Sequence, residues 1–335
     1  MRTLKDIRAS KPPAYPDNAI YAEYACIHFG LSFQDLDGGT GLVFRVASPS
    51  ATLSFGGGRC SVFPQNNAAA ATLAADKYFT QRVLADQGIP CLAGEYFFLH
   101  DRHRAHRPPG HERNDALAYF EALNSTAFVK PLHGSRGDFA RPVAGRDDLA
   151  AHLDAIAQFY DSVLIQPIVR GDEYRFFLLD HEPLYTVRKE PPCLIGDGRR
   201  NLPELLAEHN RELYARGLSP TDIAPDSRAV GHVPAAGERI PLRGRMNRSA
   251  GGAMTFAAPA RAQAALALAR RASHALGLRA AAVDLFTDID GDPEAMAVIE
   301  VNANPSVRFL EDSGRADLIL AIWRHTFTAM GLLRV

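Results

Sequence analysis

Two short apolar runs near the C-terminal end of the chain constrain its fold more than any other feature. The runs cover residues 280–286 and 297–301, and the segment between them, 288–294, is rich in turn-forming residues. Two such runs around a polar turn are typical of a β-hairpin. When this hairpin is folded about its middle, Asp284 falls opposite Glu300.

Three polar side chains of the expected hairpin indicate a metal site. Alternate side chains of a strand share a face, so Glu300 and Asn302 point to one side, where Asp284 joins them. A buried pair of like charges is costly unless the pair is neutralised or holds a metal. Mg²⁺ prefers such oxygen ligands, usually beside substrate phosphates. We therefore interpret these three residues as metal ligands; the alternative is a set of solvated acids at a strand end.

Composition limits the class of protein. At 335 residues the chain is long enough for more than one domain. Its net charge of −1 gives no global field that would favour nucleic acid or an anionic membrane. No apolar run approaches the roughly 20 residues of a membrane helix, and no apolar core follows the basic start. The four cysteines lack CxxC spacing, which favours a reducing compartment, so we expect a cytoplasmic protein.

Lysine is rare in this chain, so its positions are informative. Only five of the 37 basic residues are lysines, among them Lys77, Lys130 and Lys189. Lys130 ends an apolar run and precedes a loop that contains Gly134 and Gly137. Glycine lets backbone N–H groups approach phosphate oxygens, and lysine supplies a point charge for them. The loop is not a Walker A motif, and taken alone it is equally compatible with a plain turn.

The expected elements mix helices and strands without strict alternation, which favours an α+β fold over a doubly wound sheet. A polar segment at 100–113, with four histidines and two prolines, is expected to be an exposed loop. We expect helices at 18–30, 76–87, 147–159, 203–214, 259–276 and 315–330. We expect strands at 31–36, 41–46, 95–99, 126–130, 163–166, 173–179 and 183–189, in addition to the hairpin.

In this order, the motifs resemble those of the ATP-grasp superfamily of carboxylate–amine ligases. The likeness is greatest to the ATP-grasp part of cyanophycin synthetases and to glutathione-synthetase-like enzymes, and it covers residues 45–325. Its motifs are Asp76-Lys77-x-x-Thr80 with Gly88-Ile89-Pro90, the Lys130 loop, the hinge Gln166–Arg175, Ile195-Gly196-Asp197-Gly198, Asn247-x-Ser249-x-Gly251-Gly252, and Glu300-x-Asn302-x-x-Pro305 with Arg308. Ser306 departs from the glycine that the family often has, and the large partner domain of cyanophycin synthetase is absent.

The resemblance implies an ATP-grasp fold with a nucleotide cleft between a small lid and a larger domain built on a mixed or antiparallel sheet. By this reading, residues 1–72 form a short N-terminal α/β domain and 73–335 the ATP-grasp domain. The lid would span about 93–162 and the C-terminal catalytic part about 163–335.

The resemblance also implies roles for individual residues. Two Mg²⁺ ions, with Mn²⁺ as a substitute, would be held by Asp284, Glu300 and Asn302. Substrate binding or catalysis would involve Arg243, Asn247, Ser249 and Arg308. ATP would contact Lys77, Lys130, Gly134, Ser135, Arg136, Gly137, Gln166, Pro167, Ile168, Val169, Glu173 and Lys189.

The implied activity is an ATP-dependent ligation. A substrate carboxylate would become an acylphosphate, an amine would attack it, and ADP and phosphate would leave. The expected substrates are small amino acids or peptides, with no nucleic acid or membrane partner and with a homodimer as one arrangement. Two alternatives stay open at this point: an ATP-dependent small-molecule phosphotransferase and a non-catalytic Mg·ATP-binding protein.

Overall fold

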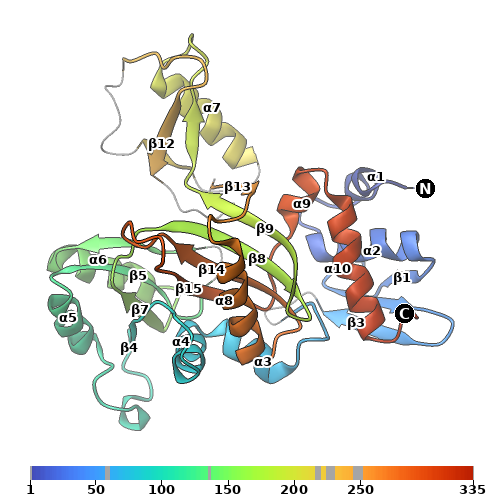
Figure 1. The fold of residues 1–335 in the computed structure, drawn as a ribbon, viewed down its shortest axis with the longest axis horizontal. Coiled ribbons are helices and arrows are strands. Elements are labelled where there is room, and N and C mark those ends of the chain that lie inside the picture. The colour runs from blue at the N-terminus through green and yellow to red at the C-terminus, as the bar shows by residue number, and fades with distance from the viewer. Residues whose placement is uncertain are drawn as a thin grey trace.

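The computed structural model describes residues 2–56, 61–134, 137–215, 220–223, 231–243 and 252–334, with only the backbone for residues 222, 223 and 243. Within these ranges the chain forms a central sheet, a lid on one side of it, an N-terminal unit on the other side and a small projecting unit (Figure 1). Both chain ends lie in the N-terminal unit.

The central sheet has five antiparallel strands in the order β13-β9-β8-β14-β15. The strands are β8 (Asp172–Leu179), β9 (Glu182–Glu190), β13 (Ala253–Phe256), β14 (Ala280–Thr287) and β15 (Ala297–Asn302). The expected hairpin at 280–301 is therefore confirmed, and so is the one formed by β8 and β9. As predicted, Asp284 pairs with Glu300 across β14 and β15.

Helices cover one face of the central sheet and form a buried core with it. Ala281, Val283 and Leu285 of β14 pack there against apolar residues of the helices. The helices are α3 (Ala68–Ala75), α4 (Lys77–Asp86) and α8 (Ala262–Ala275). The Asp76 side chain caps α4, because it accepts bonds from the backbone N–H groups of Tyr78 and Phe79 at 2.8 and 2.9 Å. The position of α4 confirms the helix expected at 76–87.

The lid is a four-stranded antiparallel sheet in the order β4-β7-β5-β6, with two helices on one face (Figure 1). Its core contains Ala127 and Val129 of β5, Val163 and Ile165 of β7, and apolar residues of both helices. The elements are β4 (Glu95–Phe98), α5 (Arg113–Ala122), β5 (Thr126–Pro131), β6 (Arg141–Ala144), α6 (Arg146–Ala157) and β7 (Ser162–Gln166). The short 3₁₀ helix Arg104–His106 lies in the segment expected to be a loop.

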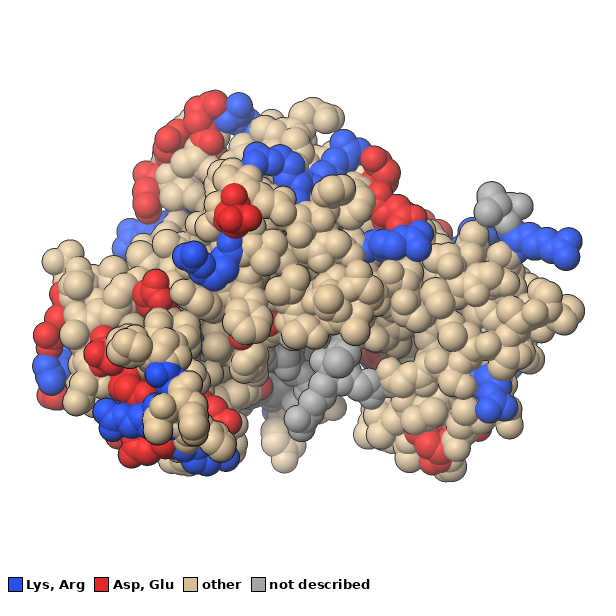
Figure 2. Space-filling model, turned by 90° about the horizontal axis from the view of Figure 1, so that it is seen from below, with Lys and Arg blue, Asp and Glu red and all other residues tan. Residues whose placement is uncertain are grey.

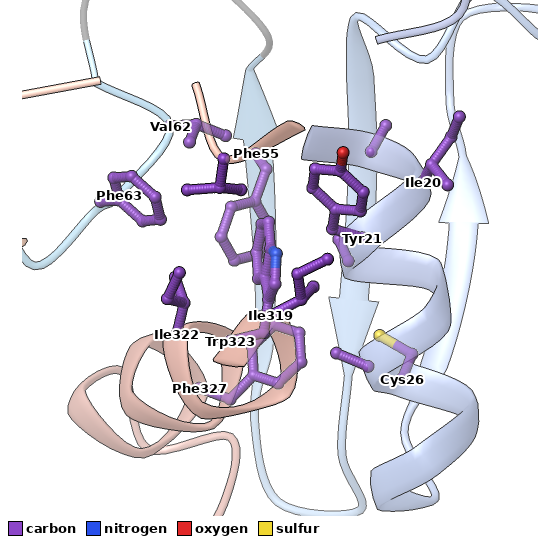
Figure 3. Close-up of a cluster of buried hydrophobic side chains, with 14 of the residues drawn as sticks. Ile20, Tyr21, Cys26, Phe55, Val62, Phe63, Ile319, Ile322, Trp323 and Phe327 are labelled. Atoms are coloured by element: carbon purple, nitrogen blue, oxygen red, sulfur yellow. The ribbon is translucent and has the colours of Figure 1, made fainter. Parts of the chain in front are cut away.

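The N-terminal unit shares one hydrophobic core with the C-terminal helices. Trp323 contacts Phe55 and Phe327, while Tyr21 and Cys26 approach from the opposite helix (Figure 3). The elements of this region are α1 (Leu4–Ala9), α2 (Asp17–Phe29), β1 (Ser32–Asp35), β2 (Val43–Ala47), β3 (Thr52–Gly56), α9 (Arg308–Asp312) and α10 (Ala316–Ala329). The boundary at residue 72 stays a prediction, since the core joins residues from both ends of the chain.

A small unit projects from the end of the central sheet (Figure 1). Its three strands pair in the order β10-β12-β11, and Leu194, Leu202, Leu205, Ile240 and Leu242 form its own small core with α7. The elements are β10 (Cys193–Ile195), α7 (Leu202–Ala215), β11 (Asp222–Ile223) and β12 (Arg239–Arg243).

Most expected elements exist, and the missed ones share a property. The sequence analysis did not foresee α1, α3, α5, α9 or the strands β3, β6, β10, β11, β12 and β13. Most of these are short, and an element of a few residues shows too little periodicity to be recognised. The helix α3 is nearly all alanine, AAAATLAA, so it carries no polar face to set against an apolar one.

Two global features concern membrane-spanning helices and surface charge. In the described ranges, no helix has the length and apolar character needed to cross a membrane. On the face drawn in Figure 2, basic and acidic side chains are interspersed and neither sign forms a continuous patch.

Candidate active site

The helix-free face of the lid sheet carries Lys130. Since neighbouring residues of a strand face opposite ways, Val129 points to the lid helices and Lys130 points away from them. Lys130 pairs with Leu164 of β7, and Gln166 lies two positions further along on the same face. All three side chains are buried, although none of them contributes to the core of the lid.

The face of the central sheet opposite α3, α4 and α8 carries four charged side chains in neighbouring strands. Arg175 of β8 pairs with Asp284 of β14, and Glu173 of β8 pairs with Lys189 of β9. Tyr174 and Phe176, the neighbours of Arg175, point into the core on the helix side. Strand alternation alone therefore places these charges on the face opposite α3, α4 and α8.

A bulge in β15 sets the position of Glu300. Asp284 pairs with Glu300, but Leu285 pairs with Val298, so Ile299 is the extra residue of the bulge. Bulges of this kind redirect side chains next to functional sites. As a result Val298 and Val301 both face the core, while Glu300 and Asn302 share the polar face with Asp284. The sequence analysis placed these side chains on one face but did not foresee the bulge.

Asp284 is fully buried and has two cationic partners. Arg175 donates to its two carboxylate oxygens at 2.7 Å each, and Lys189 lies 3.3 Å from Oδ2. Burial alone would raise the pKa of Asp284, but the charges of Arg175 and Lys189 outweigh burial and hold that pKa well below its usual range. The carboxylate is thus ionised and strongly bound within the protein.

Lys189 joins Asp284 to a second acid. Its ammonium group contacts the Glu173 carboxylate as well as Asp284, and its side chain is only 3% exposed. Burial disfavours the ammonium form, yet the charges of Asp284 and Glu173 raise the pKa of Lys189 above its ordinary value. These four residues, Glu173, Arg175, Lys189 and Asp284, form what we call the tetrad.

Lys130 and Lys77 bring positive charge to the same place from the lid and from α4. Burial lowers the pKa of Lys130 to about 8, and Glu300 is the acid that opposes this shift most strongly. Burial also lowers the pKa of Lys77, again with Glu300 as the first opposing acid. Two lysines from separate parts of the sequence therefore interact electrostatically with the same carboxylate.

Both lysines lack an acidic partner within ion-pair distance among the described residues. Lys77 Nζ donates instead to the carbonyl oxygens of Leu132 and Gly134, at 3.2 and 2.9 Å. These carbonyls belong to the loop after β5, so Lys77 holds the backbone of the predicted phosphate loop. A buried ammonium without a carboxylate partner is costly, and it is the kind of group that an anionic ligand can satisfy.

Glu300 is the acid of this region that has no basic partner within ion-pair distance in the described part of the chain. It accepts a hydrogen bond from the Asn302 amide nitrogen at 3.1 Å, which leaves the Asn302 amide oxygen available as an acceptor, and its carboxyl group also lies within hydrogen-bond reach of Asp284. Two carboxylates and this oxygen are suitable donors for a hard divalent cation. No group of three or more His, Cys, Asp or Glu in the described ranges could hold a metal, so the donor set would need ligand oxygens as well.

The predicted adenine contacts are Gln166 and the hinge residues that follow it, and the predicted ribose contact is Glu173 of the tetrad. The Gln166 amide donates to the Leu92 carbonyl at 3.2 Å. Gly94 approaches it so closely that an added Cβ would lie 2.5 Å from Gln166 Cγ. The hinge residues Pro167, Ile168 and Val169 follow β7 directly. Their role in nucleotide binding, like that of Glu173, stays a prediction.

Several predicted site residues cannot be placed. Ser135, Arg136, Asn247 and Ser249 lie outside the described residues, and so does the Arg243 side chain. The backbone of Arg243 ends β12 in the projecting unit. Gly137 is described and has a φ of +70°, a backbone conformation that glycine adopts without strain.

Arg308 lies against three acids that do not belong to the tetrad. Its guanidinium lies 3.1 Å from Asp17, 3.5 Å from Glu311 and 3.2 Å from Asp312. These contacts join α9 to α2. The predicted role of Arg308 in substrate binding stays a prediction, and its observed contacts are structural ones.

The sequence analysis missed one member of the tetrad. Arg175 appeared there only as the end of the hinge motif, yet it is the main partner of Asp284. The signal was present, because Arg175 stands two positions after Glu173 in an expected strand and therefore shares its face. What the sequence could not supply was the pairing of β8 with β14.

No family model matches the chain. It is 27% identical to a glutathione biosynthesis bifunctional protein of Streptococcus mutans, over 70% of this chain and 32% of that protein. It is 26% identical to a cyanophycin synthetase of Trichormus variabilis, over 70% of this chain and 27% of that protein. The chain therefore spans about a third or less of the curated relatives that it matches.

Solved structures show the fold. The crystal structure of a bifunctional glutathione synthetase from Pasteurella multocida matches with a TM-score of 0.54 and 21% identity, over 88% of this chain and 41% of that chain. A D-alanine–D-alanine ligase from Bacillus anthracis matches with a TM-score of 0.50 and 14% identity, over 79% and 71%. The chain has the α+β ATP-grasp fold and resembles the ATP-grasp carboxylate–amine ligases, as the motif order predicted.

Proposed function

We propose that this chain, which has the ATP-grasp fold, is an ATP-dependent carboxylate–amine ligase acting on small amino acids or peptides. One observation carries the proposal: Lys130 and Lys77 both lie within electrostatic range of Glu300, and none of the three has an ion-pair partner among the described residues. They lie where the lid and the central sheet carry their charges. Two ammonium groups and a carboxylate without ion-pair partners are suited to bind a ligand that carries phosphates together with a metal ion.

The relatives support the type of reaction. Two are named for glutathione biosynthesis and for cyanophycin synthesis, and the structural neighbours are a glutathione synthetase and a D-alanine–D-alanine ligase. We infer from these names that this chain also forms a C–N bond at the expense of ATP. Their matched regions are parts of longer proteins, so the particular substrates do not transfer.

The proposed residues have distinct tasks. Lys130 and Lys77 would hold phosphate oxygens, and Lys77 would give up its carbonyl acceptors when it does so. Asp284, Glu300 and Asn302 would hold magnesium, which neutralises charge on the phosphates when bound. Gln166 and the hinge would contact the base, and Glu173 the ribose. These roles use the side chains on the charged faces of the two sheets.

The proposed reaction has two steps. A carboxylate oxygen of one substrate attacks the γ-phosphorus, the bond to the β–γ bridging oxygen breaks, and ADP leaves with that electron pair. The nitrogen of the second substrate then attacks the acyl carbon of the acylphosphate, phosphate leaves, and the nitrogen loses its proton. The first step is needed because a carboxylate is a poor electrophile at neutral pH.

A screen for ADP release tests this proposal. Purified protein is given Mg·ATP with pairs of amino acids or dipeptides, and ADP is measured by a coupled assay with mass analysis of products. We expect release that requires both a carboxylate and an amine and that Glu300→Gln lowers by roughly 1,000-fold, because a lost metal ligand removes several kcal/mol of charge stabilisation. ATP turnover that ignores every carboxylate and amine would contradict the ligase assignment.

A further inference from the structure

A cation of the chain itself already occupies the Asp284 carboxylate. Arg175 lies directly across from Asp284 in the pairing of β8 with β14. Its Nε donates to Oδ1 and its terminal nitrogen to Oδ2, both at 2.7 Å. The Arg175 side chain is 11% exposed and the Asp284 side chain 0%. Two parallel bonds of this kind are the strongest arrangement between a guanidinium and a carboxylate.

Few acceptor positions of Asp284 are left for a metal. A carboxylate offers about four acceptor positions, two on each oxygen. Oδ2 receives bonds from Arg175 and from Lys189 at 3.3 Å, while Oδ1 receives one from Arg175. These two cations leave one acceptor position, and the Glu300 carboxyl group lies within hydrogen-bond reach of Asp284. A metal ion that takes more than this position must displace the guanidinium.

The tetrad is also balanced in charge. With all four side chains ionised, Arg175 and Lys189 carry two positive charges, and Glu173 and Asp284 carry two negative ones; burial raises the pKa of Glu173, and the Lys189 ammonium opposes this shift. All four side chains are buried or nearly so. A divalent ion at Asp284 therefore adds charge to a set that is already neutral, and it does so beside two cations. Glu300 lies outside the tetrad and has no ion-pair partner among the described residues.

We propose that Arg175 is an internal counter-ion of Asp284, with which a divalent metal ion must compete for the carboxylate. The inference rests on the proposed function, because it takes Asp284 as a metal ligand. Arg175 acts through Asp284 and is a positioning residue. It keeps the sheet stable when no metal is bound, and its charge lowers the affinity of this site for the metal.

The variant Arg175→Met separates these two effects. Thermal unfolding is followed by circular dichroism in EDTA and in Mn²⁺, each with ADP present, and Mn²⁺ binding is measured by electron paramagnetic resonance. In EDTA we expect the variant to melt roughly 5–10 °C below the original chain, because an unpaired Asp284 stays buried. In Mn²⁺ we expect most of this loss to be recovered, with Mn²⁺ bound roughly tenfold more tightly than by the original chain.

The neighbouring pair of strands β8 and β9 supplies a matched control. Arg188 of β9 pairs with Asp172 of β8 at 2.7 Å, but both side chains are about 40% exposed, at 40% and 43%. Arg188→Met should change the melting temperature by no more than roughly 1–2 °C and leave Mn²⁺ affinity unchanged. The double variant Arg175→Met with Asp284→Asn should regain stability in EDTA and gain nothing from Mn²⁺.

Three outcomes decide the matter. If Arg175→Met binds Mn²⁺ no more tightly than the original chain, while the original chain binds it, competition is wrong and the inference is overturned. If the original chain with ADP binds no Mn²⁺, the metal assignment of the proposed function fails and takes this inference with it. If Arg175→Met does not fold, Arg175→Lys replaces it: a smaller gain in Mn²⁺ affinity supports competition, and no gain overturns it.

Discussion

The chain contains two networks of linked charges that differ in how completely they are paired. One joins α1, α2 and α9: Arg8 contacts Asp17 at 2.7 Å and Glu311 at 2.5 Å, and Arg308 contacts both acids as well. Tyr21 adds a hydrogen bond to Glu311 at 2.9 Å. The other network is the tetrad, extended by Lys77, Lys130 and Glu300.

The difference between them indicates different purposes. In the first network every charge has a partner inside the protein, as a purely structural network requires. Around the tetrad, Lys130, Lys77 and Glu300 have no ion-pair partner among the described residues, although Lys130 is 7% exposed. Burying unpaired charges costs stability. Such a cost is typical of a site that is completed by a ligand, here the proposed nucleotide and metal.

The largest expected effect comes from removing an unpaired charge. Lys130→Met should weaken ADP binding in Mg²⁺ by roughly 10- to 100-fold, because a charged bond to phosphate is lost. The same change should leave the fold as stable or stabilise it by roughly 1–3 kcal/mol, since the buried ammonium had no carboxylate partner. Calorimetry and urea unfolding measure the two effects.

A loss of both stability and ADP binding in Lys130→Met would contradict the difference between the two networks, because it would mean that Lys130 has a charge partner in the folded chain. Lys11→Met is a suitable control. Lys11 contacts Glu23 at 2.5 Å in the N-terminal unit, so this change should leave ADP binding unaltered.

The next effect concerns the fully paired network. Glu311→Gln should lower the free energy of unfolding by about 2 kcal/mol, because Arg8 and Arg308 both lose charge partners in a half-buried setting. Nucleotide affinity should stay the same. Urea unfolding and ADP titration of the variant test this pairing of results, and weakened ADP binding in a folded variant would be evidence against a purely structural network.

The third effect is a dependence of stability on pH. The folded-state pKa of Lys130 is about 8, against 10.5 for a free lysine, so the unfolded chain binds more protons between these values. Stability from this residue therefore rises with pH across roughly 8 to 10.5. The original chain should gain about 1–3 kcal/mol relative to Lys130→Met over this window. Parallel unfolding curves at all pH values would contradict the burial of an unpaired lysine.

The smallest effect is expected at an exposed pair. Arg315 and Asp317 lie 2.6 Å apart, but their side chains are 42% and 60% exposed. Asp317→Asn should change the free energy of unfolding by less than about 0.5 kcal/mol. A change as large as that of Glu311→Gln would show that burial does not distinguish these ion pairs.

Strand alternation made much of the site predictable. The hairpin pattern placed Asp284 opposite Glu300, and the structure has that register. The scarcity of lysine pointed to Lys130 and Lys77, which both interact electrostatically with Glu300. These inferences needed only local periodicity and a turn, which the sequence carries directly.

The missed features depend on contacts between distant segments. The bond between Arg175 and Asp284 requires β8 to pair with β14, which lies more than a hundred positions away. The Ile299 bulge depends on how β15 meets β14, and the ion pairs of Arg308 depend on where α2 packs. Periodicity shows which face a residue takes and not which strand or helix lies beside it.

The central claim is that Lys77, Lys130 and Glu300, which lack ion-pair partners among the described residues, bind a nucleotide together with magnesium. Calorimetric titration of ADP in Mg²⁺ and in EDTA, for the original chain and for Glu300→Gln, tests it most directly. We expect binding that weakens at least roughly tenfold when magnesium is removed and by a similar factor in the variant. Equal ADP affinity under all four conditions, or no binding in any, would contradict the claim.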